Sequence, residues 1–152
     1  MSPNRILSRL SRADFRLLEP HLERMELPVR TLLQARNKRV DQVYFMESGF
    51  ASVVANGGHD IEIGIIGREG MTGLSVVMDI NDRAPHETYI QYAGSGQRMA
   101  ADNLREAIDA SVVLHRVLLH YAHAFMVQTT QTALANGRSK IEERLARWLA
   151  GC

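Results

Sequence analysis

The chain has 152 residues, of which 45% are hydrophobic and 23% charged, and its formal net charge at pH 7 is +1. These values are typical of one globular domain with ample core material and give no overall bias toward nucleic acid. The single cysteine, Cys152, excludes a disulfide within the chain and a cysteine-ligated iron–sulfur cluster or zinc site, and the N-terminus lacks the apolar core of a signal peptide, so we expect a cytoplasmic protein.

An amphipathic helix is predicted near the N-terminus. Ser11 and Asp14 stand three residues apart, as in a capping box, in which a hydroxyl caps the first turn of a helix. Pro28 is expected to end the helix. One face of it is formed by apolar residues that recur three or four positions apart: Phe15, Leu18, Leu22 and Met25.

From residue 29 onward the pattern changes to short apolar runs with a period of two. Asn56-Gly57-Gly58 lies between two such runs and predicts a hairpin, because a type I′ turn needs positive φ at both central residues. Short strands separated by glycine-containing turns are typical of an antiparallel sandwich or jelly roll, which with the helices gives an α+β fold. Strands are expected at 31–34, 43–46, 50–55, 60–66, 88–93 and 97–100.

Four glycines, Gly64, Gly67, Gly70 and Gly73, recur within the segment 64–75. Such a run forms either a series of tight corners or a cradle of backbone amides for an anion. It lacks the Gly-Lys-Ser/Thr ending of a Walker loop, and its spacing is not that of a dinucleotide fingerprint. Taken alone, the glycine run favours the series of tight corners over the anion cradle.

A short helix is expected from Asp102, as its cap, to Ile108, and a long one over 112–135, capped by Ser111. The long helix carries two apolar stripes, so it must be covered on two sides. We expect the sandwich to cover one side and the same helix of a second subunit to cover the other. One stripe holds Leu114, Leu118, Tyr121, Phe125, Gln128, Thr132 and Ala135, and the other holds Val113, Val117, His120, Ala124, Val127, Gln131 and Leu134. The dimer interface is predicted at Leu114, Leu118, Tyr121, Phe125, Gln128 and Thr132.

Asn136-Gly137 is expected to end the long helix, since glycine readily takes the left-handed conformation after a helix. A second capping box, from Ser139 to Glu142, then predicts another helix. Its apolar face, formed by Ile141, Leu145, Trp148 and Leu149, has nothing downstream to bury it. This indicates a partner domain that is absent from the chain.

The order of these elements resembles the sensory half of Crp/Fnr-type transcription regulators, which is a cyclic-nucleotide-binding domain. The residues that carry the resemblance are 43–49, 57–58 with 62–67, the glycine-rich segment 70–75, and 138–150. It implies a sandwich domain over 1–110, a dimerisation helix over 111–136, and a hinge and first DNA-binding helix over 137–152. The winged helix-turn-helix of the family is not in this chain, so we expect contact with DNA only through such a further domain.

The resemblance places the phosphate cassette of the family at 70–75 and implies a ligand site with the following residues: Gly70, Gly73, Leu74, Ser75, Arg83, His86, Phe125 and Thr129. Cyclic AMP is disfavoured, because Leu74 stands where its binders have a glutamate for the ribose. His86, beside Glu87, stands where they have an arginine for the phosphate, and Arg83 comes three residues early. The ligand itself is not identified by the sequence.

The sequence therefore predicts an effector-sensing and dimerising regulator module, without enzymatic activity, metal or membrane segment. One alternative is a ligand-free dimeric module that docks on a partner through 141–149. Another is a small metal-dependent jelly-roll enzyme, for which the sheet region offers only His59 and His86. His120 and His123 share a helix face but lack the further ligands of a metal site.

Overall fold

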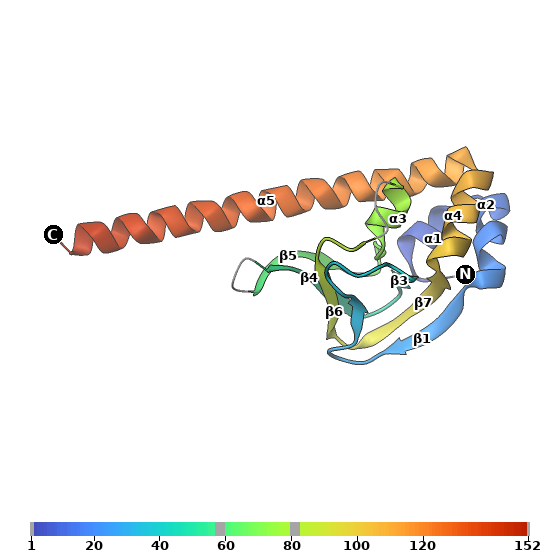
Figure 1. Ribbon diagram of the computed structural model, residues 1–152, viewed down its shortest axis with the longest axis horizontal. Coiled ribbons are helices and arrows are strands. Elements are labelled where there is room, and N and C mark those ends of the chain that lie inside the picture. The colour runs from blue at the N-terminus through green and yellow to red at the C-terminus, as the bar shows by residue number, and fades with distance from the viewer. Residues whose placement is uncertain (1, 57–59, 80–82, 152) are drawn as a thin grey trace.

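The computed structural model describes residues 2–56, 60–79 and 83–151. Two small sheets form a sandwich, short helices gather at one end of it, and α5 runs along it and projects far beyond (Figure 1). The elements are α1 (Arg5–Arg9), α2 (Arg12–Leu18), the 3₁₀ turn η1 (Glu19–His21), β1 (Glu23–Leu27), β2 (Leu32–Gln34), β3 (Gln42–Met46), β4 (Phe50–Asn56), β5 (Asp60–Ile66), α3 (Leu74–Met78), β6 (Glu87–Tyr92), β7 (Gly94–Ala100), α4 (Ala101–Ala110) and α5 (Val112–Ala150).

The sandwich pairs a sheet of order β1-β7-β3 with one of order β2-β6-β4-β5, and every neighbouring pair is antiparallel. Met46 from the first sheet and Ile90 from the second are fully buried in one apolar cluster between them. This confirms the predicted antiparallel α+β sandwich. The turn predicted at Asn56–Gly58 falls at 57–58 outside the described residues, although the flanking strands β4 and β5 do pair.

A second apolar cluster joins the short helices to the first third of α5. Leu18, Leu104, Leu114 and Leu118 have no exposed surface in it. The capping of α2 is confirmed, since the Ser11 hydroxyl accepts from the backbone N–H of Asp14. The Asp14 carboxylate accepts from the hydroxyl of Ser111 at 2.7 Å, so it connects α2 to the start of α5.

The helix expected to run as far as Met25 is shorter than predicted. α2 ends at Leu18 and is followed by η1, in which Pro20 lies in the first positions. Proline has no backbone N–H and clashes with the preceding turn of an α-helix, so it ends the helix earlier than the apolar spacing indicated. Met25 instead lies in β1, opposite Gly96 of β7.

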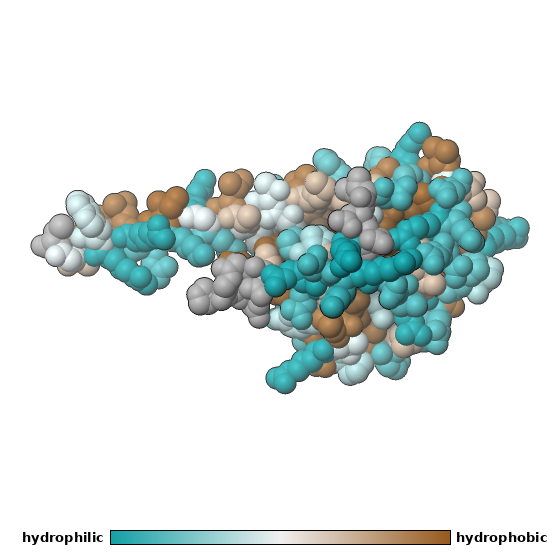
Figure 2. Space-filling model, viewed as in Figure 1, coloured by the Kyte–Doolittle hydropathy of each residue, from teal (hydrophilic) through white to brown (hydrophobic). Residues whose placement is uncertain are grey.

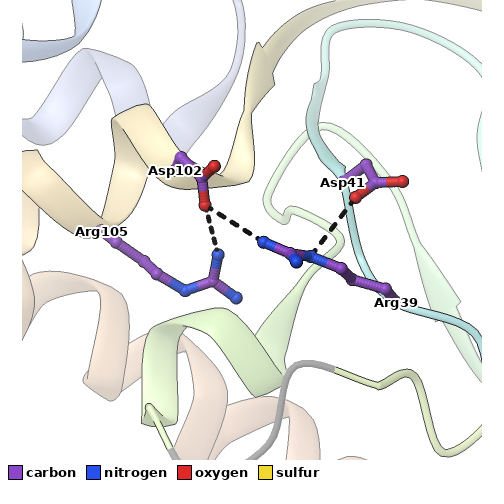
Figure 3. Close-up of polar contacts among 4 residues, drawn as sticks. All are labelled: Arg39, Asp41, Asp102 and Arg105. Atoms are coloured by element: carbon purple, nitrogen blue, oxygen red, sulfur yellow. Dashed lines mark hydrogen bonds and ion pairs between the residues drawn. The ribbon is translucent and has the colours of Figure 1, made fainter.

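Asp102 does not cap α4, whose N-cap is Ala100 without a side-chain hydrogen bond. Its carboxylate instead lies 2.9 Å from a guanidinium nitrogen of Arg105 and 3.6 Å from one of Arg39, which also contacts Asp41 (Figure 3). This exposed network links the segment before β3 to α4. Exposed pairs of this kind contribute little to stability, about 0–1 kcal/mol each.

The break predicted at Gly137 is wrong. α5 continues without a break through Gly137, and the whole helix has 39 residues, or about 58 Å at the usual rise per residue. No atom lies within 4 Å of the position that a Cβ of Gly137 would take. A glycine in an exposed helix costs only about 1 kcal/mol and does not by itself end the helix.

Candidate functional site

A cavity of about 390 Å³ opens between the sandwich, α3 and α5. Its volume lies within the range of small-molecule sites, roughly 300–1,000 Å³. It is lined by Gln34, Val53, Ile63, Ile66, Met71, Thr72, Gly73, Leu74, Ser75, Met78, Arg83, Pro85, His86, Thr88, Phe125, Met126 and Thr129. The residues therefore come from β2, β4, β5, β6, the glycine-rich segment, α3, the segment 83–86 and the long helix.

Most of the predicted ligand-site residues meet at this cavity, although they come from three distant parts of the sequence: Gly73, Leu74, Ser75, Arg83, His86, Phe125 and Thr129. Gly70 does not line it. Its carbonyl accepts from Asn4 Nδ2 at 2.8 Å, and the space that a Cβ would take is filled by the Tyr121 hydroxyl. Gly70 is therefore a close-packing position under α5.

Two glycines of the run are required by geometry. Gly73 has a φ of +87° as N-cap of α3, and its Cβ would meet the side chain of Val43. A Cβ on Gly64 would lie 2.8 Å from the Phe125 ring and 3.2 Å from Thr129. Gly64 thus lets α5 approach β5 closely, and this approach positions Phe125 and Thr129 at the cavity.

α3 is connected to α5 by a polar contact as well as by packing. Nε2 of His115 on α5 lies 2.7 Å from the carbonyl oxygen of Val77 on α3. Leu74 and Ser75, at the start of α3, line the cavity. α3, which borders the cavity, is therefore fixed to α5 by this contact.

The rim segment 83–86 is held to residues 37–38. Ala84 exchanges backbone hydrogen bonds with Asn37 and Lys38, at 2.7 and 2.9 Å. Arg83 is exposed, and its guanidinium donates to the Asn37 carbonyl at 2.8 Å. Arg39, which follows residues 37–38, contacts Asp102 of α4 in the network of Figure 3.

His86 is half-buried in the cavity wall. Burial, with a smaller contribution from the Arg36 charge, lowers the pKa of His86 below its usual 6.5. The imidazole is therefore uncharged at neutral pH, and a neutral His86 does not replace the cation that a phosphate needs.

Several residues of the cavity were not predicted from the sequence. Gln34 ends a short strand, and its Oε1 is buried without a hydrogen-bond partner among the described residues. Met71, Met78 and Met126 come from three different elements and share the cavity wall. No local signal identifies them, because only the tertiary fold decides which side of each element faces the cavity.

A second hollow, a groove of about 590 Å³, is also lined by Phe125. Ile6 and Arg9 of α1 form one wall of it. The α5 residues in it are Val113, Arg116, Val117, His120, Tyr121, Ala124, Phe125 and Gln128. Phe125 is therefore shared by the cavity and the groove.

The structure excludes two residues of the predicted dimer interface. Leu114 and Leu118 have no exposed surface and pack in their own domain, so a partner could not reach them. Phe125 is 9% exposed and Tyr121 is half-buried, while Gln128 is exposed and Thr132 half-buried. Burial raises the pKa of the Tyr121 hydroxyl, so this group stays protonated where it packs against Gly70.

The exposed stripe of α5 is the other one, and it extends along the whole helix. Apolar residues stand at one heptad position, interrupted only by His120, at Val113, Val127, Leu134, Ile141 and Trp148, each more than 40% exposed. The intervening positions of the same heptad are occupied by Val117, Ala124 and Leu145, and by the polar Gln131 and Arg138. Figure 2 shows apolar side chains along the upper edge of the projecting helix. We call this row the α5 seam.

Among the described residues, no group of three or more His, Cys, Asp or Glu side chains could hold a metal ion. His59, one of the two histidines considered for a metal site, lies outside them. Within the same residues, no helix has the length and apolar character needed to cross a membrane.

No protein-family model and no curated protein sequence matches the chain. Solved structures do match its fold. The c-di-GMP-responsive global regulator CLP of Xanthomonas campestris has a TM-score of 0.70 and 16% identity, over 91% of this chain and 70% of that one. The sensor domain of the transcriptional regulator DNR from Pseudomonas aeruginosa has a TM-score of 0.61 and 10% identity, over 77% and 88%.

The regulatory domain of Toxoplasma gondii PKA, crystallised with cAMP, also matches, with a TM-score of 0.61 and 15% identity over 69% of this chain and 42% of that one. The chain thus has the fold of cyclic-nucleotide-binding domains, in the form found in the sensor domains of Crp/Fnr-type regulators. This confirms the resemblance at the level of the fold. A shared fold does not fix what each site residue binds, so their roles must be argued from the chemistry of this cavity.

Proposed function

We propose that the chain is the effector-sensing and dimerisation module of a Crp/Fnr-like transcription regulator, and that its effector is not cyclic AMP. The observation that carries the proposal is that α5 contributes to two different surfaces. One side of the helix lines a ligand-sized cavity with Phe125, Met126 and Thr129, and another side presents the α5 seam to solvent. A sensor needs such an element, which both sites can bias.

The cavity supports a sensing role over a ligand-free one. A ligand-free module would fill the cavity with its own side chains, Leu74 among them, but Leu74 lines the open volume instead. The wall also disfavours a cyclic nucleotide. Leu74 offers no acceptor to a ribose, and the Arg83 guanidinium is at the exposed rim, where it donates to Asn37.

The α5 seam supports dimerisation. A heptad row of exposed apolar residues over a helix of 39 residues is typical of a two-stranded coiled coil. The partner in the proposal is the same helix of a second subunit, and its first turns would cover the groove beside Ile6 and Val117. DNA would be contacted through a further domain, repositioned by the projecting end of α5.

Sedimentation equilibrium of matched variants tests the dimer. We expect a wild-type dimer at micromolar concentration, and Leu134→Asp should raise its dissociation constant at least about 100-fold, since each subunit loses an apolar side chain worth about 1.5–3 kcal/mol. Ala133→Asp introduces the same charge next to it, on the side of the exposed helix facing away from the seam, and should leave the constant unchanged. A monomeric wild type, or equal effects of the two variants, would reject the proposed seam.

A further inference from the structure

We propose that the cavity binds an uncharged, mainly apolar molecule of aromatic character that donates one hydrogen bond to Gln34. The biological meaning of this binding rests on the sensing role proposed above. The inference combines three features of the wall: its apolar composition, one buried polar atom without a partner, and the peripheral position of its positive charge.

The deep part of the wall is mainly apolar, with Thr72 and Thr88 as its buried polar side chains. Val53, Ile66 and Met71 are at most 5% exposed and come from β4, β5 and the glycine-rich segment. Met78 and Met126 add flexible thioethers, and methionine sulfur makes favourable contacts with aromatic rings. The Phe125 ring lies in the same wall. Such a surface favours a flat apolar body.

Gln34 supplies the polar contact. Its Oε1 is buried and accepts no hydrogen bond from the described residues. A buried acceptor without a donor costs roughly 1–3 kcal/mol. The oxygen is closed off from the open volume in the structure, and a rotation of the Gln34 side chain, which lines the cavity, would bring it to a ligand N–H or O–H that recovers this cost. The unpartnered oxygen thus selects a molecule with one donor over a plain hydrocarbon.

The charges of the wall argue against an anion. Arg83, the one Lys or Arg among the described lining residues, is exposed and at the rim. His86 is uncharged at neutral pH, since burial lowers its pKa. α3 has a single turn, so its dipole adds little. A phosphate or sulfonate in the apolar interior would lose its hydration without gaining a buried cation.

A matched pair of fluorescent probes tests this ligand class. N-phenyl-1-naphthylamine is uncharged and aromatic and carries one N–H donor, and 8-anilinonaphthalene-1-sulfonate is the same molecule with a sulfonate beside that N–H. We expect the first to bind saturably, one per chain, and the second at least about tenfold more weakly, because its charge would reach the Gln34 end. Tighter binding of the sulfonate would overturn the inference.

Variants locate the bound probe. Ser75→Phe fills the cavity and should abolish binding, whereas Arg24→Trp adds bulk to an exposed position of β1, outside the lining of both hollows, and should leave it unchanged. Gln34→Leu should weaken the amine by about 5–30-fold, the value of one buried hydrogen bond, while leaving the N-methylated amine, which has no donor, unaffected. Gln34→Met is a second replacement, and circular dichroism confirms folding of each variant. Unchanged binding in Ser75→Phe, or equal effects on both amines, would overturn the assignment.

The two proposals fail in different ways. A dimeric wild type that binds neither probe would overturn the ligand class and leave the dimerising module standing. Conversely, a monomer that binds the amine in the cavity would support the ligand class and reject the dimerisation. Cyclic AMP is included in the same titration, and its displacement of the amine at comparable concentration would overturn the ligand class and the exclusion of cyclic AMP together.

Discussion

At the scale of single residues, Asn4 shows how the N-terminus fixes the glycine-rich segment. It is fully buried, and its Nδ2 donates to the carbonyls of Met46 and Gly70, at 2.7 and 2.8 Å. Its Oδ1 accepts from the backbone N–H groups of Ile6 and Leu7 and so caps α1. One side chain therefore connects α1, the end of β3 and the segment that leads into the cavity wall.

Replacing Asn4 should be costly. Asn4→Ala removes a cap and two buried hydrogen bonds, so we expect the free energy of unfolding to fall by about 2–4 kcal/mol. Urea denaturation followed by circular dichroism measures it. Ser8→Ala, which removes an exposed hydroxyl contact in the same helix, should change stability by less than about 0.5 kcal/mol. A similarly small effect of Asn4→Ala would contradict its role as a connector.

Sequence reasoning located part of the cavity at this scale. The resemblance placed a ligand-binding cassette at 70–75, and Gly73, which has a backbone conformation that other residues rarely adopt, lines the cavity with Leu74 and Ser75. Their binding of a ligand stays a prediction. The resemblance could not separate Gly73, which lines the cavity, from Gly70, which packs under Tyr121. Gln34 was not predicted, because its unpartnered oxygen is a property of the packed structure alone.

At the scale of elements, α5 differs most from expectation. Periodicity revealed two apolar stripes but could not rank them, because both satisfy the same heptad pattern. The structure buries Leu114 and Leu118 and exposes Val113 and Val127. The reason is tertiary: the α2, α4 and α5 packing fixes the rotation of the helix, partly through the hydrogen bond of Ser111 to Asp14.

Gly137 gives a direct test of the continuous helix. Gly137→Ala should raise the helical circular dichroism signal and stabilise the helix by about 0.5–1 kcal/mol, because alanine loses less backbone entropy and nothing occupies the position of its Cβ. A hinge with a left-handed glycine would behave in the opposite way. A loss of helical signal in Gly137→Ala would therefore restore the break predicted from the sequence.

At the scale of the whole molecule, the cavity and the α5 seam share one rigid element. Phe125 lines both the cavity and the groove, and His115 connects α5 to the cavity helix α3. Filling the cavity and forming the dimer should therefore influence each other. By linkage, any effect of a ligand on dimerisation equals the effect of dimerisation on ligand binding.

The most direct test is the dimer dissociation constant, measured by sedimentation equilibrium with and without saturating N-phenyl-1-naphthylamine. We expect a change of at least about fivefold, which corresponds to a coupling free energy of about 1 kcal/mol. Ser75→Phe, in which the cavity is filled by the protein itself, should show no response to the amine. An unchanged constant in a wild-type protein whose cavity is demonstrably occupied would contradict a sensor that communicates through α5.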